Sequence, residues 1–579
     1  MSLFGSLQNA GNTLQAMQIG MAVTGNNIAN ANTEGFIRER VNYAPAPVLK
    51  KGNLSIGLGV IIDSLTQVID DNLARQLNSA TGDRVSAELQ NEAYKDLERL
   101  LGELTDTDLS TALTDFFGSI EDTLNPASGE DLSVRNLAIL EGKQLANEIQ
   151  RIDERAKQMR DDYNQQIIDA AGQINQLTSR VLDLNIRITQ IEGGGAGNSD
   201  AGALRTERNA AVNDLAELLD IDVIEQPSGG LSISVGGEFL VFEGQKREIQ
   251  VLDGSVGGEP AATLQFADTQ TELDINRGLV HGLTAARDEI VGGFRSSFDE
   301  FAQTLIFEFN KTFSGGQGLN GFTELTSADA VSDPSAALNA AGLAFSPVDG
   351  DFNITLVNTS TGDTETTKIN VQLLGQPDDT SLNDLASQIN AISGLTSSVN
   401  TEGRLVISAD APDSEFYFSG DQISGQPYQG DTSNVLAALG LNTFFTGSGS
   451  SSISVNNELD GIENASKFAA SNTGLGAGTG NAVALSQLID EPLAALDGAS
   501  IVDKYDQVVN ELAQNSTVAG SLAEGLATFE GTLSSEFQAI SGVNIDEEAI
   551  ELITLQHIYQ ATARYIATIQ EMLETLVRL

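Results

Sequence analysis

The side chains that most often do chemistry are scarce in this chain of 579 residues. It contains no cysteine, which excludes disulfides, thiol catalysis and cysteine-ligated metals together. It contains two histidines, His281 and His557, far apart in the sequence. Their separation argues against a shared site, so each is expected to be a structural residue. The spacings typical of dinucleotide sites, P-loops, nucleophile elbows and zinc proteases do not occur in the sequence.

The remaining polar motifs are better explained by turns and helix caps. Asp349-Gly-Asp351-Phe-Asn353 begins like a calcium loop but lacks the glycine at the sixth position and the glutamate at the twelfth. Asp108 precedes an apolar helix and is expected to cap it. The glycine-rich segment 474–480 is expected to be a flexible loop. We therefore predict no catalytic, cofactor-binding or metal-binding residue, and no enzyme.

Charge and length exclude further classes. The chain has 81 acidic against 30 basic residues and a net charge of −51, which argues against nucleic-acid binding and against docking on an anionic membrane. Its length suggests three to five domains, at roughly 100–200 residues each. It has no run of 18 apolar residues, so no transmembrane helix is expected. The first 33 residues carry no charge, so a secretory signal with a basic start is not expected either.

Apolar residues repeat with heptad spacing in those first 33 residues. The steps alternate between four and three, which predicts one long helix with an unbroken seam. The seam residues are Leu3, Leu7, Ala10, Leu14, Met17, Met21, Thr24 and Ile28. Because no charged side chain can form ion pairs on the outer face, the helix is weakly specified alone and is expected to need a partner.

The last 39 residues carry a second seam of nearly equal length. Asn544 and Glu547 have the spacing of a capping box, which marks the start of a helix. Two series spaced by seven follow: Ile545, Leu552, Tyr559, Ile566 and Leu573, then Leu555, Thr562, Ile569 and Leu576. Matched seams at opposite ends of the chain predict that the two ends pair. The alternative is that each is an ordinary bundle helix of a globular core.

The residues after the first seam carry a family resemblance. The stretch from Asn26 to Phe36, NNIANANTEGF, resembles the Asn-Thr-x-Gly-aromatic signature of bacterial flagellar axial proteins, the rod, hook and hook-associated proteins. Its residues here are Asn30, Asn32, Thr33, Gly35 and Phe36, and Phe36 stands where many members carry tyrosine. Gly35 also suits a left-handed helix cap. Residues 541–579 resemble the matching C-terminal signature.

The interior resembles the hook-associated members, which lie at the junction of hook and filament. The resemblance is weak across residues 320–375. The patches that carry it are Arg38–Ala44, Gly57–Val60, Asp71–Leu77, Leu109–Phe117, Arg205–Leu219 and Leu436–Gly447.

This resemblance implies a structural protein of the flagellum, located outside the cell. It implies export through the flagellar type III apparatus with the help of a cytoplasmic chaperone. It further implies a ring or short helical polymer of the chain itself, with the hook subunit below and a second hook-associated protein above. The paired terminal helices would form the inner tube, and neither nucleic acid nor membrane would be a partner.

The hydropathy pattern predicts an α+β multidomain fold. Long helices are expected at 145–191 and 505–540, a β-hairpin at 231–242, a helix at 283–309 and strands at 352–357 and 368–374. Residues 311–460 hold 18 acidic and 3 basic residues and read as an inserted, β-rich acidic domain. The predicted domains are a terminal coiled coil (1–60 and 541–579), a helical rod (61–310 and 455–540, with a β-hairpin region at 221–280) and the insert (311–454).

Three other interpretations stay open. The chain could be the hook subunit or another axial protein, which shares the terminal signatures. It could be an acidic extracellular adhesin or surface protein, although such proteins do not need matched seams at both ends. It could also be an enzyme carried on an axial scaffold, against which the missing catalytic motifs count.

Overall fold

The computed structural model describes residues 3–33, 35–51, 54–102, 108–124, 131–192, 198–242, 244–420 and 430–578. Its contacts divide the chain into two compact units. Unit 1 comprises Met1–Ala93, Asp161–Glu289 and Thr517–Leu579, and unit 2 comprises Tyr94–Arg160 and Ile290–Ser516. Helices and several small sheets make up both units, so the predicted α+β class is confirmed. The predicted division into three domains, with its boundaries, stays a prediction.

The α-helices are α1 (Leu3–Ala29), α2 (Asp71–Leu101), α3 (Leu109–Asp122), α4 (Leu132–Glu192), α5 (Gly202–Leu218), α6 (Gly278–Ala285), α7 (Gly292–Ser314), α8 (Leu382–Asn390), α9 (Val435–Leu439), α10 (Gly480–Gln487), α11 (Ile501–Ser541) and α12 (Ile545–Arg578). A π-helical segment, Ala286–Val291, joins α6 to α7. Within the described part of the chain, no helix is long and apolar enough to cross a membrane.

The strands are β1 (Glu39–Pro45), β2 (Leu49–Lys51), β3 (Leu54–Ile56), β4 (Val60–Gln67), β5 (Asn198–Ser199), β6 (Ile221–Glu225), β7 (Leu231–Val235), β8 (Glu238–Phe242), β9 (Gln245–Lys246), β10 (Ile249–Val256), β11 (Glu259–Phe266), β12 (Glu324–Thr326), β13 (Gly350–Asn358), β14 (Thr364–Val371), β15 (Leu395–Val399), β16 (Leu405–Ala409), β17 (Ser414–Ser419), β18 (Phe445–Thr446) and β19 (Ser454–Val455).

Unit 1 combines the two chain ends with three small sheets and the β2–β3 pair. In the first sheet β4 lies between β1 and β5, the second runs β6-β7-β8-β9, and β10 pairs with β11. The predicted hairpin is confirmed as β7 and β8, joined at Gly236 and Gly237, whose φ angles are 56° and 81°. Only glycine adopts two successive positive φ angles readily, which explains the sharp reversal here.

The long predicted helices are present, and the differences from prediction are local. The helix expected at 283–309 is interrupted by the π-helical segment, yet its expected apolar face, Ile290, Phe294, Phe298, Phe301 and Leu305, is buried. The strand expected at 368–374 is β14, which ends at Val371. The chain turns there because the backbone N–H of Leu373 donates to Asp349 and that of Leu374 donates to Asp379, at 3.1 and 2.9 Å.

The polar motifs behave mainly as expected. The Asp108 carboxylate accepts the Thr111 backbone N–H at 2.7 Å and caps α3. The motif that begins at Asp349 is not the predicted turn, because Gly350–Asn353 form the start of β13, where Asp351 pairs with Lys368 of β14 at 3.0 Å. His281 lies 2.9 Å from the Ser86 hydroxyl, consistent with a structural residue. Among the described residues, no cluster of three or more His, Cys, Asp or Glu side chains is arranged to hold a metal.

A cluster of phenylalanines organises unit 2. Phe116 and Phe117 of α3 pack against Phe309 of α7, and so do Phe444 and Phe445. The ring centroids of these contacts are 5.2–6.0 Å apart. Gly142 of α4 makes room for them, since an added Cβ would lie 2.5 Å from the Phe444 ring.

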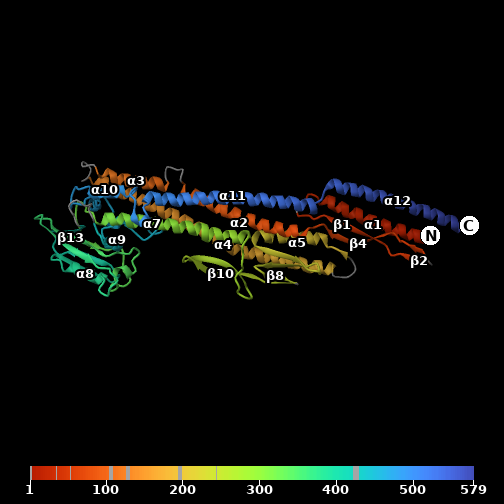
Figure 1. Cartoon of the computed structure of the whole chain (residues 1–579), viewed down its shortest axis with the longest axis horizontal. Coiled ribbons are helices and arrows are strands. Elements are labelled where there is room, and N and C mark those ends of the chain that lie inside the picture. Colours follow the sequence, from red (N-terminus) through yellow and green to blue (C-terminus); the bar gives the residue numbers. More distant parts are fainter. Residues whose placement is uncertain are drawn as a thin grey trace. The chain divides into compact units, whose positions relative to one another are not determined.

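The insert within unit 2 has its own core. That core is formed by buried residues between Phe322 and Leu441, in which β13 lies between β14 and β17 (Figure 1). Its two chain connections lie side by side, because the Asn442 side chain donates to the carbonyls of Ser314 and Gly316 at 2.9 and 3.0 Å. An inserted domain with adjacent ends and its own core is expected to be removable.

Deleting Gly318–Leu441 and closing the gap with a short glycine linker should therefore leave a soluble, folded protein. Deleting Lys311–Ser454 instead removes Phe313, Phe444 and Phe445 from the phenylalanine cluster, each at a cost of about 3–5 kcal/mol. Thermal unfolding and size-exclusion chromatography of the two deletions should give a monodisperse protein in the first case and aggregate in the second. Equal behaviour of both would show that the phenylalanine cluster does not hold unit 2 together.

Candidate assembly site

The first and last helices of the chain lie side by side in unit 1 (Figure 1). Ala16 and Met17 of α1 form a buried cluster with Leu555 of α12, and Met21 and Tyr559 pack around it. Ile62 of β4 closes the cluster on a third side. The contact joins segments more than 500 residues apart, as the matched seams suggested.

The predicted seam residues lie mainly along this contact. In α1, Ala10 and Met17 are buried, and Leu3, Leu7, Leu14, Met21 and Ile28 are partly buried. In α12, Leu555 and Ile569 are buried, and Leu552, Tyr559, Ile566 and Leu573 are partly buried. Leu576 is 63% exposed, and His557 is an exposed residue beside the seam. The assembly role of these residues remains a prediction.

Gly20 lets the two helices approach β1 closely. A Cβ atom at this position would lie 2.3 Å from the Tyr43 hydroxyl and 3.2 Å from the nearest methyl of Leu555. Gly59, in the linker, has a φ of 93° and fits against α1 in the same way, since an added Cβ would lie 2.8 Å from the Asn9 carbonyl oxygen. The Asn12 side chain donates to the Leu58 carbonyl at 3.0 Å and ties this linker to the helix.

A buried polar contact crosses the apolar seam. The Asn27 side chain donates to Glu548 at 3.0 Å, and the two residues are 1% and 7% exposed. The same carboxamide accepts the backbone N–H of Glu39 at 3.1 Å and donates to its carbonyl at 2.9 Å. One side chain thus joins α1, α12 and the start of β1. A single buried polar pair of this kind fixes the register of two helices, because a slip would leave it without partners.

The family signature forms the turn between α1 and β1. The Asn30 side chain donates to the Asn26 carbonyl at 2.9 Å, and the backbone N–H of Thr33 donates to the Asn30 carbonyl at 2.9 Å. Gly35 has the expected positive φ, 71°, but it is not the helix cap, because α1 ends at Ala29 and the turn of Asn30–Thr33 follows. Phe36 is partly buried and Asn32 is exposed.

The junction of α11 and α12 is fixed to the same turn. The Arg38 backbone N–H donates to the Ser541 carbonyl at 2.9 Å, and the Arg38 guanidinium lies 3.5 Å from Glu547. Asn544 caps α12 by accepting the Asp546 backbone N–H at 3.1 Å. The predicted capping box is incomplete, since Glu547 meets the Asn544 side chain rather than its backbone.

The cleft beside this junction is acidic and half-buried. Burial raises the pKa of Glu39, and the nearby charge of Asp200 raises it further. Burial likewise raises the pKa of Tyr43, with a contribution from Glu551. The space enclosed is about 400 Å³. Both pKa values are raised mainly because packing buries these polar groups. Glu39 and Tyr43 do not form a nucleophile paired with a base.

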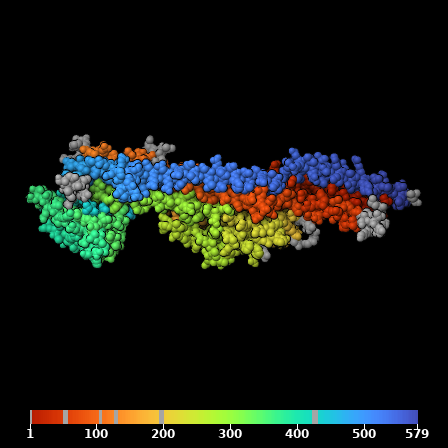
Figure 2. Space-filling view, viewed as in Figure 1, coloured from red at the N-terminus to blue at the C-terminus, as the bar shows by residue number. Residues whose placement is uncertain are grey.

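α12 carries a second seam that was not predicted from the sequence. Residues with steps of four and three run along one flank of α12, and all are exposed. Figure 2 shows α12 in dark blue beside α1 in red. They are Thr554, Ile558, Ala561, Tyr565, Thr568, Met572 and Thr575. None is charged, although the chain carries 111 charged side chains, 81 acidic and 30 basic. The seam could have been found by shifting the heptad frame, but alanine and threonine hide it from a search for large apolar residues.

The threonines of this second seam present an apolar surface. The hydroxyls of Thr554, Thr568 and Thr575 each donate to the carbonyl four residues earlier, at 2.8–3.0 Å. Their polar atoms are thus satisfied within the helix, and the methyl groups are left to face outward. Together with Ile558, Tyr565 and Met572, they form a continuous stripe suited to a helical partner.

Comparison with known proteins gives consistent relatives. Residues 94–326 match the model of the flagellar hook-associated protein FlgK helical domain, 534–579 that of the flagellar basal body rod FlgEFG protein C-terminal region, and 7–36 that of the flagella basal body rod protein. Flagellar hook-associated protein 1 of Escherichia coli (strain K12) is 22% identical over 99% of both chains. Its namesake in Bacillus subtilis (strain 168) is 23% identical over 100% of this chain and 98% of its own.

One solved structure is also similar, that of the flagellar hook junction protein FlgK from Burkholderia pseudomallei. It is 17% identical, covers 81% of this chain and 100% of its own, and has a TM-score of 0.49.

The polar contact across the α1–α12 pair makes an asymmetric prediction. Asn27→Leu removes the hydrogen bonds of the buried Glu548 carboxylate and of both backbone groups of Glu39. It should therefore destabilise the helix pair by about 2–3 kcal/mol or more. Glu548→Leu leaves Asn27 bonded to Glu39 and should cost less than about 1 kcal/mol, because leucine suits a seam position. Hydrogen exchange of α12 amides in the two variants measures both effects. Equal costs would show that the pair is not a buried register contact.

Proposed function

Because this chain is a hook-associated member of the flagellar rod and hook axial proteins, we propose that it is the structural adaptor that joins hook to filament. It acts by assembling, not by catalysis. Copies of the chain form a ring or short helical polymer, with the hook subunit on one side and a second hook-associated protein on the other. Before assembly it is exported by the flagellar type III apparatus and is accompanied in the cytoplasm by a chaperone. The working location is outside the cell, at the hook–filament junction.

The second seam of α12 is the observation that carries this proposal. The inner seam of α12 is already used within the chain, against α1. The second seam runs over 22 residues from Thr554 to Thr575, is uncharged and is open to solvent. A contiguous apolar stripe of this kind marks an interaction surface. In a polymer of identical copies, helices of neighbouring chains are the partners whose spacing matches it.

Export before assembly is consistent with the composition. The absence of cysteine prevents disulfide formation during passage between compartments of different redox state. The terminal helix α1 is uncharged and depends on α12 for a partner, so the pair completes only when both chain ends are present.

The competing functions are separated by where the protein lies. Immunogold electron microscopy of intact flagella should label one short zone between hook and filament. Label along the whole hook would identify a hook subunit, and label over the cell body would identify a surface protein.

The second seam can be tested without disturbing the free protein. Tyr565→Asp places a carboxylate at an exposed position, so the free protein should keep its stability within about 0.5 kcal/mol. In the polymer the same change loses about 1.5–3 kcal/mol of apolar burial per copy, in addition to the cost of desolvating the charge. Cells carrying it should lose filaments and fail to swim, and the purified variant should fail to sediment as polymer.

Gln560→Asp is the matched control, since it introduces the same group at an exposed position outside both seams. It should swim and assemble as the unmodified chain does. Normal filaments with Tyr565→Asp, or loss of filaments with both variants, would refute the seam as the assembly contact.

A further inference from the structure

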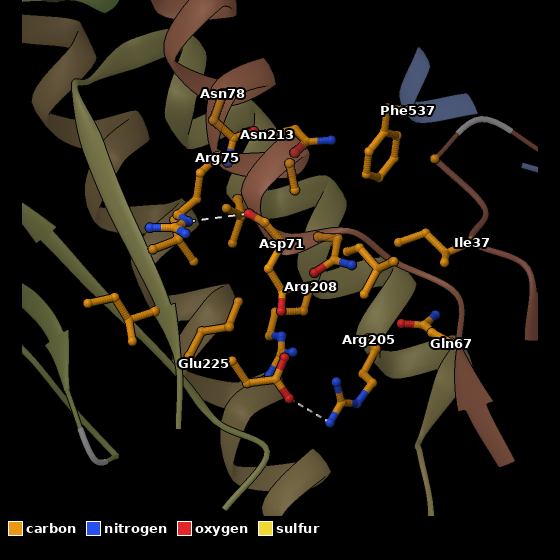
Figure 3. A pocket seen from close by; sticks show the side chains of 18 residues that line it. Ile37, Gln67, Asp71, Arg75, Asn78, Arg205, Arg208, Asn213, Glu225 and Phe537 are labelled. Atoms are coloured by element: carbon orange, nitrogen blue, oxygen red, sulfur yellow. Dashed lines mark hydrogen bonds and ion pairs between the residues drawn. The ribbon is translucent and has the colours of Figure 1, made fainter. Parts of the chain in front are cut away.

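A cavity of about 420 Å³ lies in unit 1, away from the α1–α12 contact (Figure 3). It is lined by the start of α2, by α5, by the strands β6 and β7 and by the segments that lead into them, with Phe537 of α11 at one side. Three arginines, Arg75, Arg205 and Arg208, line it together with two acidic residues, Asp71 and Glu225. Three arginines around one cavity are unexpected in a chain with 81 acidic and only 30 basic residues.

Arg208 is held rigidly in the wall of this cavity with one edge unused. Its side chain is 1% exposed, and its Nη1 donates to the Asn185 side chain at 3.1 Å and to the Gly229 carbonyl at 2.7 Å. Its Nε is buried and has no hydrogen-bond partner, and within the described residues its Nη2 has none either. The Nε–Nη2 edge of a guanidinium is the side on which a planar carboxylate binds with two parallel hydrogen bonds.

Two of the nearby carboxylates, Glu192 and Glu225, are committed to Arg205. Arg205 binds Glu192 through two hydrogen bonds of 2.8 and 2.9 Å and lies 2.9 Å from Glu225. Figure 3 shows Arg208 between Asp71 and this Arg205–Glu225 pair. Burial alone would raise the pKa of Glu192, but the hydrogen bonds from Arg205 and from the Ala201 backbone outweigh it and lower that pKa. Glu192 therefore stays ionised beside Arg205.

Burial disfavours the charged form of Arg208. Burial, and after it the repulsion of Arg205, lowers its pKa to about 10, so it is still charged at neutral pH. Val212 and Leu231 form apolar parts of the wall, which strengthen any ion pair formed inside. Arg75 stands on the opposite side with its guanidinium bonded to the uncharged acceptors Asn72 and the Asp71 carbonyl.

We propose that this cavity binds a carboxylate group, held by two hydrogen bonds from Nε and Nη2 of Arg208 and faced by Arg75. Such a ligand satisfies the buried donor of Arg208 and gives this guanidinium a hydrogen-bonded carboxylate partner. The carboxylate has two possible sources with the same chemistry, a free small carboxylate or an acidic side chain of a neighbouring copy of this chain.

The direct test is the Nε–H signal of Arg208 in a ¹H–¹⁵N correlation spectrum of the free protein. This signal is identified by its loss in Arg208→Lys, which keeps the positive charge but lacks Nε–H. Titration with malonate, at constant ionic strength set by sodium chloride, should move the signal downfield to a plateau. The Nε–H of Arg247, already bonded to Asp268 at 2.9–3.0 Å, should not move and serves as the internal reference.

Arg75→Gln gives a second test that does not touch the buried residue. Arg75 is exposed, so the variant should fold normally and bind malonate several-fold more weakly. If Arg208→Lys fails to fold, calorimetric titration of malonate into Arg75→Gln and into the unmodified chain measures the same difference in affinity without the assignment. An Arg208 signal that does not move, moves equally with chloride, or never reaches a plateau would overturn the proposal.

The source of the carboxylate is separated by a competition experiment. If a neighbouring copy supplies it, malonate should raise the protein concentration needed for polymerisation in the unmodified chain, and much less in Arg75→Gln. If the natural ligand is a free carboxylate, malonate should leave that concentration unchanged. Binding by the free protein stands or falls independently of assembly, so failure of this proposal and failure of the proposed function are distinguishable.

Discussion

The hydrogen bond between Asn27 and Glu548 constrains how the two ends of the chain pair in unit 1. It joins residues 521 positions apart and lies where the last turn of α1 meets the first turn of α12, at one end of an otherwise apolar helix pair. Apolar seams of equal period can slip by a heptad at little cost, whereas a buried carboxylate cannot lose its donor cheaply. Because the Asn27 carboxamide also holds both backbone groups of Glu39, the register of α1 on α12 fixes where β1 begins. This contact therefore holds the two ends of the chain together, and the chain between them starts and finishes at the same place in unit 1.

Because this contact fixes α12 against α1, two faces of α12 have different environments. The face toward α1 is closed within one chain by Leu555 and Ile569, and an uncharged stripe of exposed residues runs along the flank of α12, with Leu3 of α1 beside its C-terminal end. If α12 contacts α1 with one face and a neighbouring copy with another, the folding of a subunit and its assembly depend on the same helix. Its N-terminus is held by Asn544 and by the contact of Arg38 with Ser541, so its direction is set before any neighbour arrives. The proposed assembly surface thus lies on a helix whose direction is already set within the chain.

Patterns that repeat locally could be predicted from the sequence, and contacts that cross the chain could not. The heptads at both ends, the hairpin at Gly236 and Gly237 and the cap at Asp108 depend on neighbours a few residues away, and each appears in the structure. The role of Asn27 depends on a glutamate 521 positions later, and Arg208 looks like any surface arginine of a helix until Asn185 and Gly229 are placed around it. The second seam of α12 was readable in principle. It was missed because a threonine looks polar until its hydroxyl is seen to bond back to its own helix.

The central claim is that α12 uses one face within the chain and the other between copies, and thiol labelling tests it most directly, because the chain has no cysteine of its own. Single cysteines replacing Met17, Tyr565 and Gln560 would be reacted with a maleimide in the free protein and in the assembled polymer. The account predicts slow labelling at Met17 in both states, fast labelling at Gln560 in both, and labelling at Tyr565 that is fast in the free protein and slow in the polymer. Equally fast labelling of Tyr565 in both states, or fast labelling of Met17 in the free protein, would contradict it.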